Sequence, residues 1–345
     1  MSLRIVVSRR IPDPGLSMLR DSGAAVHIVQ DDPGAAVDRA ALLDAVADAD
    51  VLVCLLTERI DESLLVHATR LRGTANFAVG FNNIDVSAAT RLGIPVSNTP
   101  GVLTESTADL TWALLLATAR RIPEAHNYMV HGEYQIWGPE LFLGDDAGRG
   151  PDGEQRTLGI IGFGRIGQAV ARRARGFDMR VVTYDPYMRD AIAASDDVEW
   201  SDFDALLQCS DFVSLHALLT PETHHLIGER ELRLMKPHAY LINVARGEMI
   251  DENVLVRALN ERWIAGAALD VYEREPAMAD GLADCSNAVF VPHIGSATRG
   301  TRNRMATMAA ASAVAHLTLQ QAPRVVNHAV YGSAAYRARI ASFVV

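Results

Sequence analysis

An arginine, a glutamate and a histidine each follow a predicted buried strand in the C-terminal half of the chain. Arg246 lies in Asn-Val-Ala-Arg-Gly, Glu275 in Leu-Asp-Val-Tyr-Glu-Arg-Glu-Pro and His293 in Val-Pro-His-Ile-Gly-Ser. The carboxyl ends of parallel strands form the ligand crevice of an open α/β sheet. Hydride transfer to a 2-keto acid needs a cation for the carboxylate and carbonyl, a proton donor, and a partner that keeps the donor charged. The three residues are candidates for these roles, although each of them alone is more often a surface or loop residue.

A glycine-rich turn precedes these residues. The apolar run at 158–161 leads into Gly162, Gly164 and Gly167, and a helix is predicted at 168–175. Such glycines allow a tight turn, close approach of a pyrophosphate and packing of helix on strand, while the helix N-terminus attracts phosphate. The next predicted strand ends at Asp185, eighteen residues after Gly167, where a carboxylate can accept the ribose hydroxyls. This order predicts a dinucleotide site. The alternative is a purely structural turn with Asp185 capping a loop.

The charge of Asp185 bears on the choice of cofactor. A carboxylate at this position would repel the additional phosphate of NADP(H), at a cost of about a few kcal/mol in a partly desolvated pocket. We therefore expect NAD(H). Arg189, four residues later, acts against this preference and leaves use of NADP(H) open.

Composition excludes several classes of function. The chain has 345 residues, of which 49% are hydrophobic, and this length suggests about two domains. Its net charge of −10 gives no attraction for nucleic acid. Of its 32 basic residues 31 are arginine, and Lys236 lies in neither a phosphate loop nor an apolar pocket, which excludes lysine chemistry.

The remaining composition indicates a reduced, non-membrane protein. The three cysteines are far apart, so we expect no disulfide framework and no metal site. No stretch reaches the ~18 apolar residues that cross a bilayer, and the N-terminus lacks the pattern of a signal peptide. We therefore expect a cytoplasmic location and no membrane partner.

Predicted strands and helices alternate in two successive series, which indicates parallel sheets covered on both faces. The predicted strands are 4–8, 25–29, 51–55, 75–79 and 94–97, then 157–162, 180–184, 212–216, 239–244, 265–269 and 288–291. An apolar helix at 105–121, with Thr104 as N-cap, should be buried all round, either inside one core or partly by a second subunit. A polar loop at 144–153 separates the two series, and a helix at 302–319 precedes a mixed tail.

The order of these motifs resembles the D-isomer-specific 2-hydroxyacid dehydrogenase family, from Leu3 to about Asn327. The motifs are GxGxxG, Asn-Val-Ala-Arg-Gly, Leu-Asp-Val-Tyr-x-x-Glu-Pro and Pro-His-Ile-Gly-Ser-Ala-Thr. The resemblance implies that Arg246 binds the substrate carboxylate and carbonyl and that His293 is the general acid/base. It implies that Glu275 hydrogen-bonds His293 and, as an opposite charge, favours the protonated imidazole.

Within the family the chain is most similar to glyoxylate/hydroxypyruvate reductases, through residues 8–12, 54–57, 78–85 and 137–139. This similarity implies reduction of a small 2-keto acid to the D-2-hydroxy acid with NAD(P)H, and the reverse oxidation. It implies five further substrate residues: Leu56 lining the pocket, the N–H groups of Val79 and Gly80 on the carboxylate, Ser296 close to substrate, and Trp137 reaching into a neighbouring subunit. An aromatic side chain packed in its own subunit is the alternative for Trp137.

The resemblance also implies a fold and further cofactor contacts. A Rossmann dinucleotide-binding domain, residues 105–298 with a dimerisation helix and arm, is inserted into a flavodoxin-like substrate domain, residues 1–104 and 299–345. Closure of the two lobes would exclude water, and the helix at 105–121 would lie in a homodimer interface. The additional cofactor residues are Thr104, Arg165, Ile166, Val244, Ala245, Asp270 (toward the nicotinamide amide), His293 and Gly295.

Some features depart from the family, and other functions stay open. Asp185 stands where close relatives often carry Arg or Ser, Leu218 replaces the usual proline, and the loop at 144–153 and the residues after Asn327 lack clear counterparts. The alternatives are a family member acting on another 2-hydroxy acid, an NAD-sensing corepressor of the same fold, and an adenosyl-methionine-binding protein. Only the first two account for the Arg246, Glu275 and His293 set.

Overall fold

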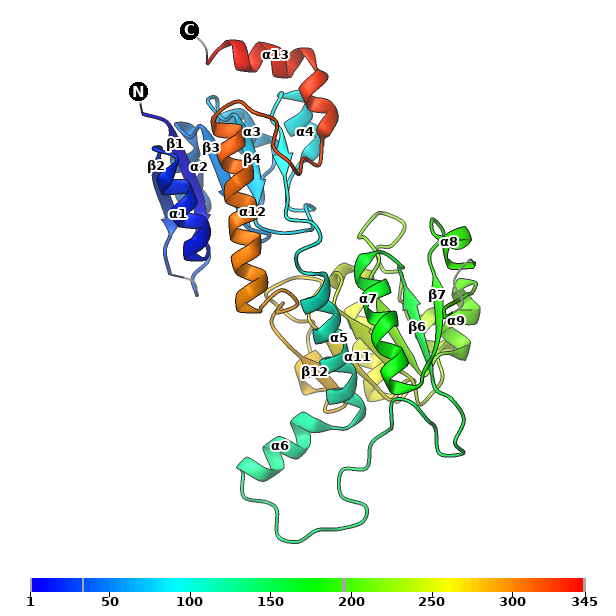
Figure 1. The fold of residues 1–345 in the computed structure, drawn as a ribbon. Coiled ribbons are helices and arrows are strands. Elements are labelled where there is room, and N and C mark those ends of the chain that lie inside the picture. The colour runs from blue at the N-terminus through cyan, green and yellow to red at the C-terminus, as the bar shows by residue number, and fades with distance from the viewer. Residues whose placement is uncertain (1, 33, 194–196, 344–345) are drawn as a thin grey trace. The chain divides into compact units, whose positions relative to one another are not determined.

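The chain forms two parallel β-sheets, one in each of two units (Figure 1). The computed structural model describes residues 2–32, 34–193 and 197–343. One unit comprises Met1–Leu103 with Ala297–Val345, and the other comprises Thr104–Ser296. The predicted α/β class is therefore confirmed, with a separate sheet for each series of strands.

The first unit has a five-stranded sheet of order β2-β1-β3-β4-β5, the order found in flavodoxin-like folds. Its strands are β1 (Arg4–Arg9), β2 (Ala25–Gln30), β3 (Val51–Cys54), β4 (Gly73–Asn76) and β5 (Val96–Ser97). Its helices are α1 (Asp13–Asp21), α2 (Arg39–Ala47), α3 (Glu62–His67), α4 (Val86–Arg91), α12 (Arg299–Leu317) and α13 (Ala334–Ala341). Alternate residues of β3 face opposite cores: Val51 and Val53 pack with α1 and α12, while Leu52 and Cys54 pack with α2, α3 and α4.

The second unit has a seven-stranded sheet of order β12-β11-β10-β9-β6-β7-β8. From β6 the chain adds β7 and β8 on one side, and it then crosses to the other side of β6, where it adds β9 to β12. This is the strand order of dinucleotide-binding folds. Its strands are β6 (Thr157–Ile161), β7 (Arg180–Tyr184), β8 (Glu199–Trp200), β9 (Phe212–Leu215), β10 (Tyr240–Asn243), β11 (Gly266–Leu269) and β12 (Ala288–Phe290). Its helices are α5 (Thr104–Ala119), α6 (Ile122–Val130), α7 (Arg165–Ala174), α8 (Arg189–Ala193), α9 (Phe203–Cys209), α10 (Glu229–Leu234) and α11 (Glu252–Asn260).

All eleven strands predicted from the sequence are present, with ends that differ by at most three residues. β8 and the helix α6 were not predicted. Thr104 is the first residue of α5 and not its N-cap, so that prediction was wrong. Within one chain α5 is not buried all round, so the alternative of a helix inside one core is wrong, while partial burial by a second subunit stays a prediction. Glu105 and Asp109 lie on an exposed stripe, where Arg173 of α7 pairs with both. None of the described helices is long and apolar enough to cross a bilayer.

The tail after α12 is fixed to the first unit by polar contacts with its backbone. The amide of Asn327 donates to the carbonyl of Ile94 (3.0 Å) and accepts from the N–H of Val96 (2.9 Å), at the end of the sheet. On α13, the guanidinium of Arg339 donates to the carbonyls of Leu71 (2.6 Å) and Ala68 (3.0 Å). A third carbonyl, that of Leu92, lies 3.2 Å from the same group. Burial lowers the pKa of Arg339 to about 10.

We expect Arg339→Ala to lower the free energy of unfolding by ~1 to 3 kcal/mol, because several buried carbonyls lose their donor. Arg337→Ala is the matched control. Arg337 lies on the same helix and, among the described residues, donates only to the exposed Gly332 carbonyl, so its effect should stay within about 0.5 kcal/mol. Urea unfolding of both variants measures the difference. Equal effects would show that the tail is not held by Arg339.

Candidate active site

Glu275 and His293 form a hydrogen-bonded ion pair in the second unit. Nδ1 of His293 lies 2.9 Å from Oε2 and 3.2 Å from Oε1 of Glu275. Burial disfavours the charge of Glu275, but the hydrogen bond and the charge of His293 outweigh it and hold its pKa below the ordinary value. Because Nδ1 is occupied by the carboxylate, Nε2 is the nitrogen that can exchange a proton with a ligand.

The backbone of His293 is held in an unusual conformation by Asp270. His293 has φ of +52°, a left-handed conformation that non-glycine residues adopt at an energetic cost. Its N–H donates to the Asp270 carbonyl (2.9 Å), and the Asp270 carboxylate accepts the next two amides, of Ile294 (2.5 Å) and Gly295 (2.9 Å). Asp270 is only 1% exposed, and burial raises its pKa. Its two oxygens therefore hold the His293 loop, in addition to any contact with a cofactor.

The turn that carries Arg246 is shaped by the buried Asn243 at the end of β10. The side chain of Asn243 accepts the Ala245 N–H (3.0 Å) and donates to the Arg246 carbonyl (2.8 Å). The backbone of Gly247 packs directly against the segment that precedes Glu275, since a Cβ on Gly247 would lie 1.8 Å from the carbonyl carbon of Tyr272. Glycine is thus required for the segments of Arg246 and Glu275 to approach each other. Burial lowers the pKa of Arg246, while the charges of Glu248 and Glu275 act in the opposite direction.

The glycine-rich turn fits a dinucleotide. A Cβ at Gly162 would lie 2.5 Å from the Ala217 nitrogen, and one at Gly167 would lie 2.3 Å from the Gly162 oxygen, so packing requires both glycines. A Cβ at Gly164 would meet no atom within 4 Å. The missing side chain at Gly164 therefore leaves open space at the N-terminus of α7, where the backbone of a dinucleotide-binding turn approaches a pyrophosphate. Arg165, the first residue of α7, is also exposed.

Asp185 is fixed at the end of β7. Its Oδ2 accepts the Phe163 N–H of the glycine-rich turn (2.9 Å), and its Oδ1 accepts the Tyr187 N–H (2.9 Å). The guanidinium of Arg189 lies over the Trp200 ring, 4.2 Å from its centroid. The cation that could offset Asp185 is thus engaged with an aromatic ring in this structure.

The other predicted cofactor residues of the second unit lie at the same edge of its sheet. Ile166 follows Arg165 in α7, and Val244 and Ala245 precede Arg246 after β10. Thr104 begins α5, and Ser296, which is a predicted substrate residue, follows Gly295 with partial exposure. The Gly295 carbonyl accepts the hydroxyl of Thr107 at 3.3 Å, which joins the His293 loop to the first turn of α5.

The predicted substrate residues of the first unit lie in two loops at the ends of its strands. Asn76 donates to the Gly80 carbonyl (2.8 Å) and Asn98 donates to the Val79 carbonyl (2.8 Å). No acceptor for the N–H of Val79 or Gly80 occurs within the described part of the chain, so both groups are available to a carboxylate. Leu56, 37% exposed, follows β3.

A buried glutamate holds the Leu56 loop. Oε2 of Glu58 accepts the Leu55 N–H (2.6 Å) and the Ser8 hydroxyl (2.5 Å), and Oε1 accepts the Thr57 hydroxyl (2.7 Å). Sequence reasoning missed Glu58, as it missed Asn243, because their types and positions are ordinary for a loop and for a strand end.

Trp137 lies on the long segment between α6 and β6, which extends away from the sheet of its unit (Figure 1). Its side chain is 72% exposed and that of Ile136 is 80% exposed. Trp137 is therefore not packed in its own subunit in this structure.

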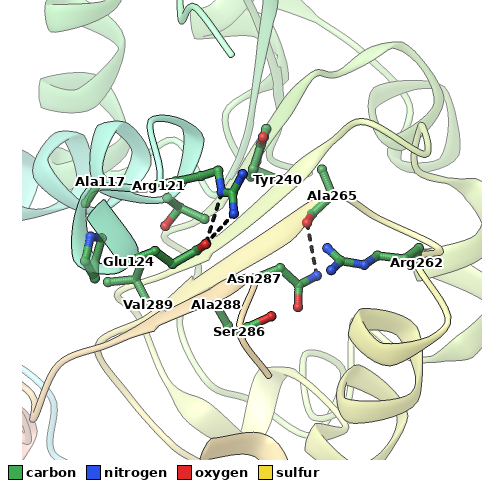
Figure 2. Close-up of a pocket in the computed structure, with 12 residues that line it drawn as sticks. Ala117, Arg121, Glu124, Tyr240, Arg262, Ala265, Ser286, Asn287, Ala288 and Val289 are labelled. Carbon is green, nitrogen blue, oxygen red and sulfur yellow. Dashed lines mark hydrogen bonds and ion pairs between the residues drawn. The ribbon is translucent and has the colours of Figure 1, made fainter. Parts of the chain in front are cut away.

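A cavity of about 330 Å³ lies elsewhere in the second unit and contains none of the predicted site residues. Figure 2 shows Arg121 and Glu124 paired at one wall and Asn287 donating to the Ala265 carbonyl at another. The catalytic candidates are therefore not joined by this cavity.

Comparison with known proteins decides the family. Residues 112–295 match the family model described as "D-isomer specific 2-hydroxyacid dehydrogenase, NAD binding domain". The chain belongs to this family. It is 46% identical over 334 residues to a glyoxylate reductase of Thermococcus gammatolerans, covering 96% of this chain and 97% of that protein.

Two solved structures extend the comparison. The TT0316 protein of Thermus thermophilus has a TM-score of 0.85 at 41% identity, covering 94% of this chain and all of that one. An NADPH-dependent glyoxylate/hydroxypyruvate reductase of Sinorhizobium meliloti has a TM-score of 0.78 at 29% identity, covering 95% and 97%. The family resemblance inferred from the motifs is confirmed.

Proposed function

We propose that this protein reduces glyoxylate, hydroxypyruvate or a similar small 2-keto acid to the D-2-hydroxy acid, and catalyses the reverse oxidation. The observation that carries the proposal is the Glu275–His293 pair, 2.9 Å apart, on the same sheet edge as Arg246 and the glycine-rich turn. The named relatives act on substrates of this class.

Each of the three residues has a distinct role in this proposal. The bound nicotinamide dinucleotide supplies the hydride. Arg246 binds the substrate carboxylate and polarises the keto oxygen, for which a planar guanidinium suits better than an ammonium. His293 donates the proton on Nε2 to the oxygen that becomes the hydroxyl, and Glu275 stays ionised to stabilise the imidazolium.

In the first unit, the proposed substrate domain, Val79 and Gly80 are proposed carboxylate ligands because their N–H groups have no acceptor in the described chain. The proposed cofactor ligands are those predicted from the sequence. Among them Asp270 also holds the His293 loop, so its substitution should affect both proton transfer and cofactor binding.

We expect the purified protein to oxidise NADH in the presence of glyoxylate or hydroxypyruvate, and His293→Ala to lower kcat by about 10² to 10⁴, since the proton donor is lost. Absorbance at the NADH band with a panel of 2-keto acids measures this. A protein that binds NADH and turns over none of the panel would be a binding module of the same fold, and the proposed reaction would be wrong.

We further propose that NAD(H) is preferred over NADP(H), because the carboxylate of Asp185 is fixed by two amides at the end of β7. Asp185→Ser should raise the NADPH-to-NADH ratio of kcat/KM by roughly tenfold or more, since repulsion of the additional phosphate disappears. Arg189→Ala is the control, and its ratio should change little because the guanidinium lies over Trp200. An unchanged ratio in Asp185→Ser would refute this assignment.

We also propose a homodimer in which Trp137 of each chain closes the substrate pocket of its partner. The support is the run of exposed apolar side chains between α6 and β6, including Ile136 and Trp137, since exposed apolar patches of this kind mark interaction sites. Sedimentation should give a dimer, and Trp137→Ala should raise KM for the keto acid.

Mixed dimers test the exchange of Trp137 directly. In a dimer of one Trp137→Ala chain and one His293→Ala chain, one site combines an intact His293 with Trp137 from the other chain. Mixing the variants should therefore restore the wild-type KM in part of the sites. A monomer in sedimentation, or mixtures that only average the two variants, would place Trp137 outside the partner's pocket.

A further inference from the structure

Glu252 is a buried carboxylate that bridges two backbone amides on either side of Glu275. It is the first residue of α11 and is 2% exposed. Its Oε1 accepts the N–H of Glu273 (2.8 Å), and its Oε2 accepts the N–H of Ala279 (3.0 Å). Both donors belong to the segment after β11 and neither belongs to its own helix.

The segment between the two amides is a tight turn with Glu275 in it. The N–H of Ala277 donates to the Arg274 carbonyl (2.9 Å), and this hydrogen bond closes a four-residue turn at 274–277, between the amides of Glu273 and Ala279. Glu275 then reaches Nδ1 of His293 (2.9 Å) while its Oε1 accepts the Tyr272 N–H (3.1 Å). Glu252 thus holds both ends of the turn whose middle carries the carboxylate for His293.

An acidic residue in the first turn of a helix that interacts only with the dipole of that helix would differ from Glu252 in its exposure and its contacts. Such a residue is typically exposed and gains about 0.3 to 1 kcal/mol from the helix. Glu252 is buried, and burial raises its pKa, although the amides of Glu273 and Ala279 act in the opposite direction. A desolvated carboxylate is costly unless hydrogen bonds satisfy it, so its presence here indicates that the bridging contacts are what it provides.

We propose that Glu252 is a positioning residue for the proposed reaction: by accepting the amides of Glu273 and Ala279, it fixes the turn from which Glu275 reaches His293. This inference rests on the proposed function. It assigns no contact of Glu252 with substrate or cofactor.

The test is Glu252→Gln. A glutamine oxygen can accept one of the two amides, but its NH₂ group then faces the other donor, so one end of the turn is released. Because displacement of a catalytic group by about 1 Å can cost ~100-fold in rate, we expect kcat to fall roughly ten- to hundredfold. The Kd for NADH should stay within about twofold, since the glycine-rich turn is untouched.

The pH profile supplies a readout that a general loss of stability would not give. Glu275 is faced by His293 and Arg246 as cations and by Asp270 and Tyr272, and the His293 bond helps to hold its pKa low. The proposed reaction needs Glu275 ionised, so its rate is lost as pH falls through this pKa. Loosening the turn weakens the bond, and the acid limb of kcat/KM should move to higher pH in Glu252→Gln.

Asp280→Asn is the matched control. Asp280 lines the same cavity of about 230 Å³ as Glu252 and Glu273, and it is exposed. Its substitution removes the same charge but no bridge between the two amides, so kcat and the acid limb should be unchanged.

Formate rescue tests the chemistry of the bridge. Glu252→Ala leaves a hole beside this cavity, and formate has two oxygens that can accept the amides of Glu273 and Ala279. We expect formate to restore part of kcat in Glu252→Ala and none in Glu275→Gln. If Glu252→Ala and Glu252→Gln do not fold, Glu252→Asp, which keeps the charge but is one methylene shorter, should show an intermediate loss and the same shift of the acid limb.

The outcomes separate this inference from the proposed function. If the wild-type protein is inactive on all 2-keto acids, the proposed function is wrong. Hydrogen exchange would still test the two hydrogen bonds of Glu252 in that case, because the amides of Glu273 and Ala279 should exchange faster in Glu252→Gln. With an active wild type, the positioning role is wrong if Glu252→Gln keeps kcat and the acid limb. It is also wrong if the variant loses NADH binding and thermal stability in the same proportion as kcat.

Discussion

Buried carboxylates that accept backbone N–H groups hold the loops on which the proposed chemistry depends. Asp270 takes two amides of the His293 loop, Glu252 takes one on each side of Glu275, and Glu58 takes the amide before Leu56. An irregular loop leaves its amides without partners, and a buried carboxylate lacks donors. Pairing the two satisfies both, and charge-assisted hydrogen bonds of this kind are stronger than neutral ones.

This arrangement explains how His293 can keep a left-handed backbone conformation. Such a conformation costs of the order of 1 to 3 kcal/mol for a non-glycine residue. Three hydrogen bonds to Asp270, one to its carbonyl and two to its carboxylate, determine the path of residues 293–295 and offset that cost. The imidazole is thereby held against Glu275 by hydrogen bonds of the chain itself, and preorganisation of this kind favours an efficient proton donor.

The sequence allowed the strands, the glycine-rich turn and the Arg246, Glu275 and His293 set to be predicted, because each is marked by apolar runs or a motif of fixed spacing. It did not allow Glu252 or Glu58 to be found. A buried glutamate that bridges two amides has the same local sequence as an exposed first-turn or loop acid, and only the fold brings its donors near. The same limit applies to α5, whose apolar composition suggested burial on every face, although Glu105 and Asp109 mark a stripe exposed in this chain.

The net charge of −10 can then be reconciled with an anionic substrate. Part of the acidic excess lies in these carboxylates, which are directed at backbone amides and away from solvent. Arg246 is itself half-buried, and in such surroundings a guanidinium remains charged while its attraction for a carboxylate is screened less than in water. In the proposed reaction, the attraction for substrate would therefore depend on the local field at Arg246 more than on the sign of the whole surface.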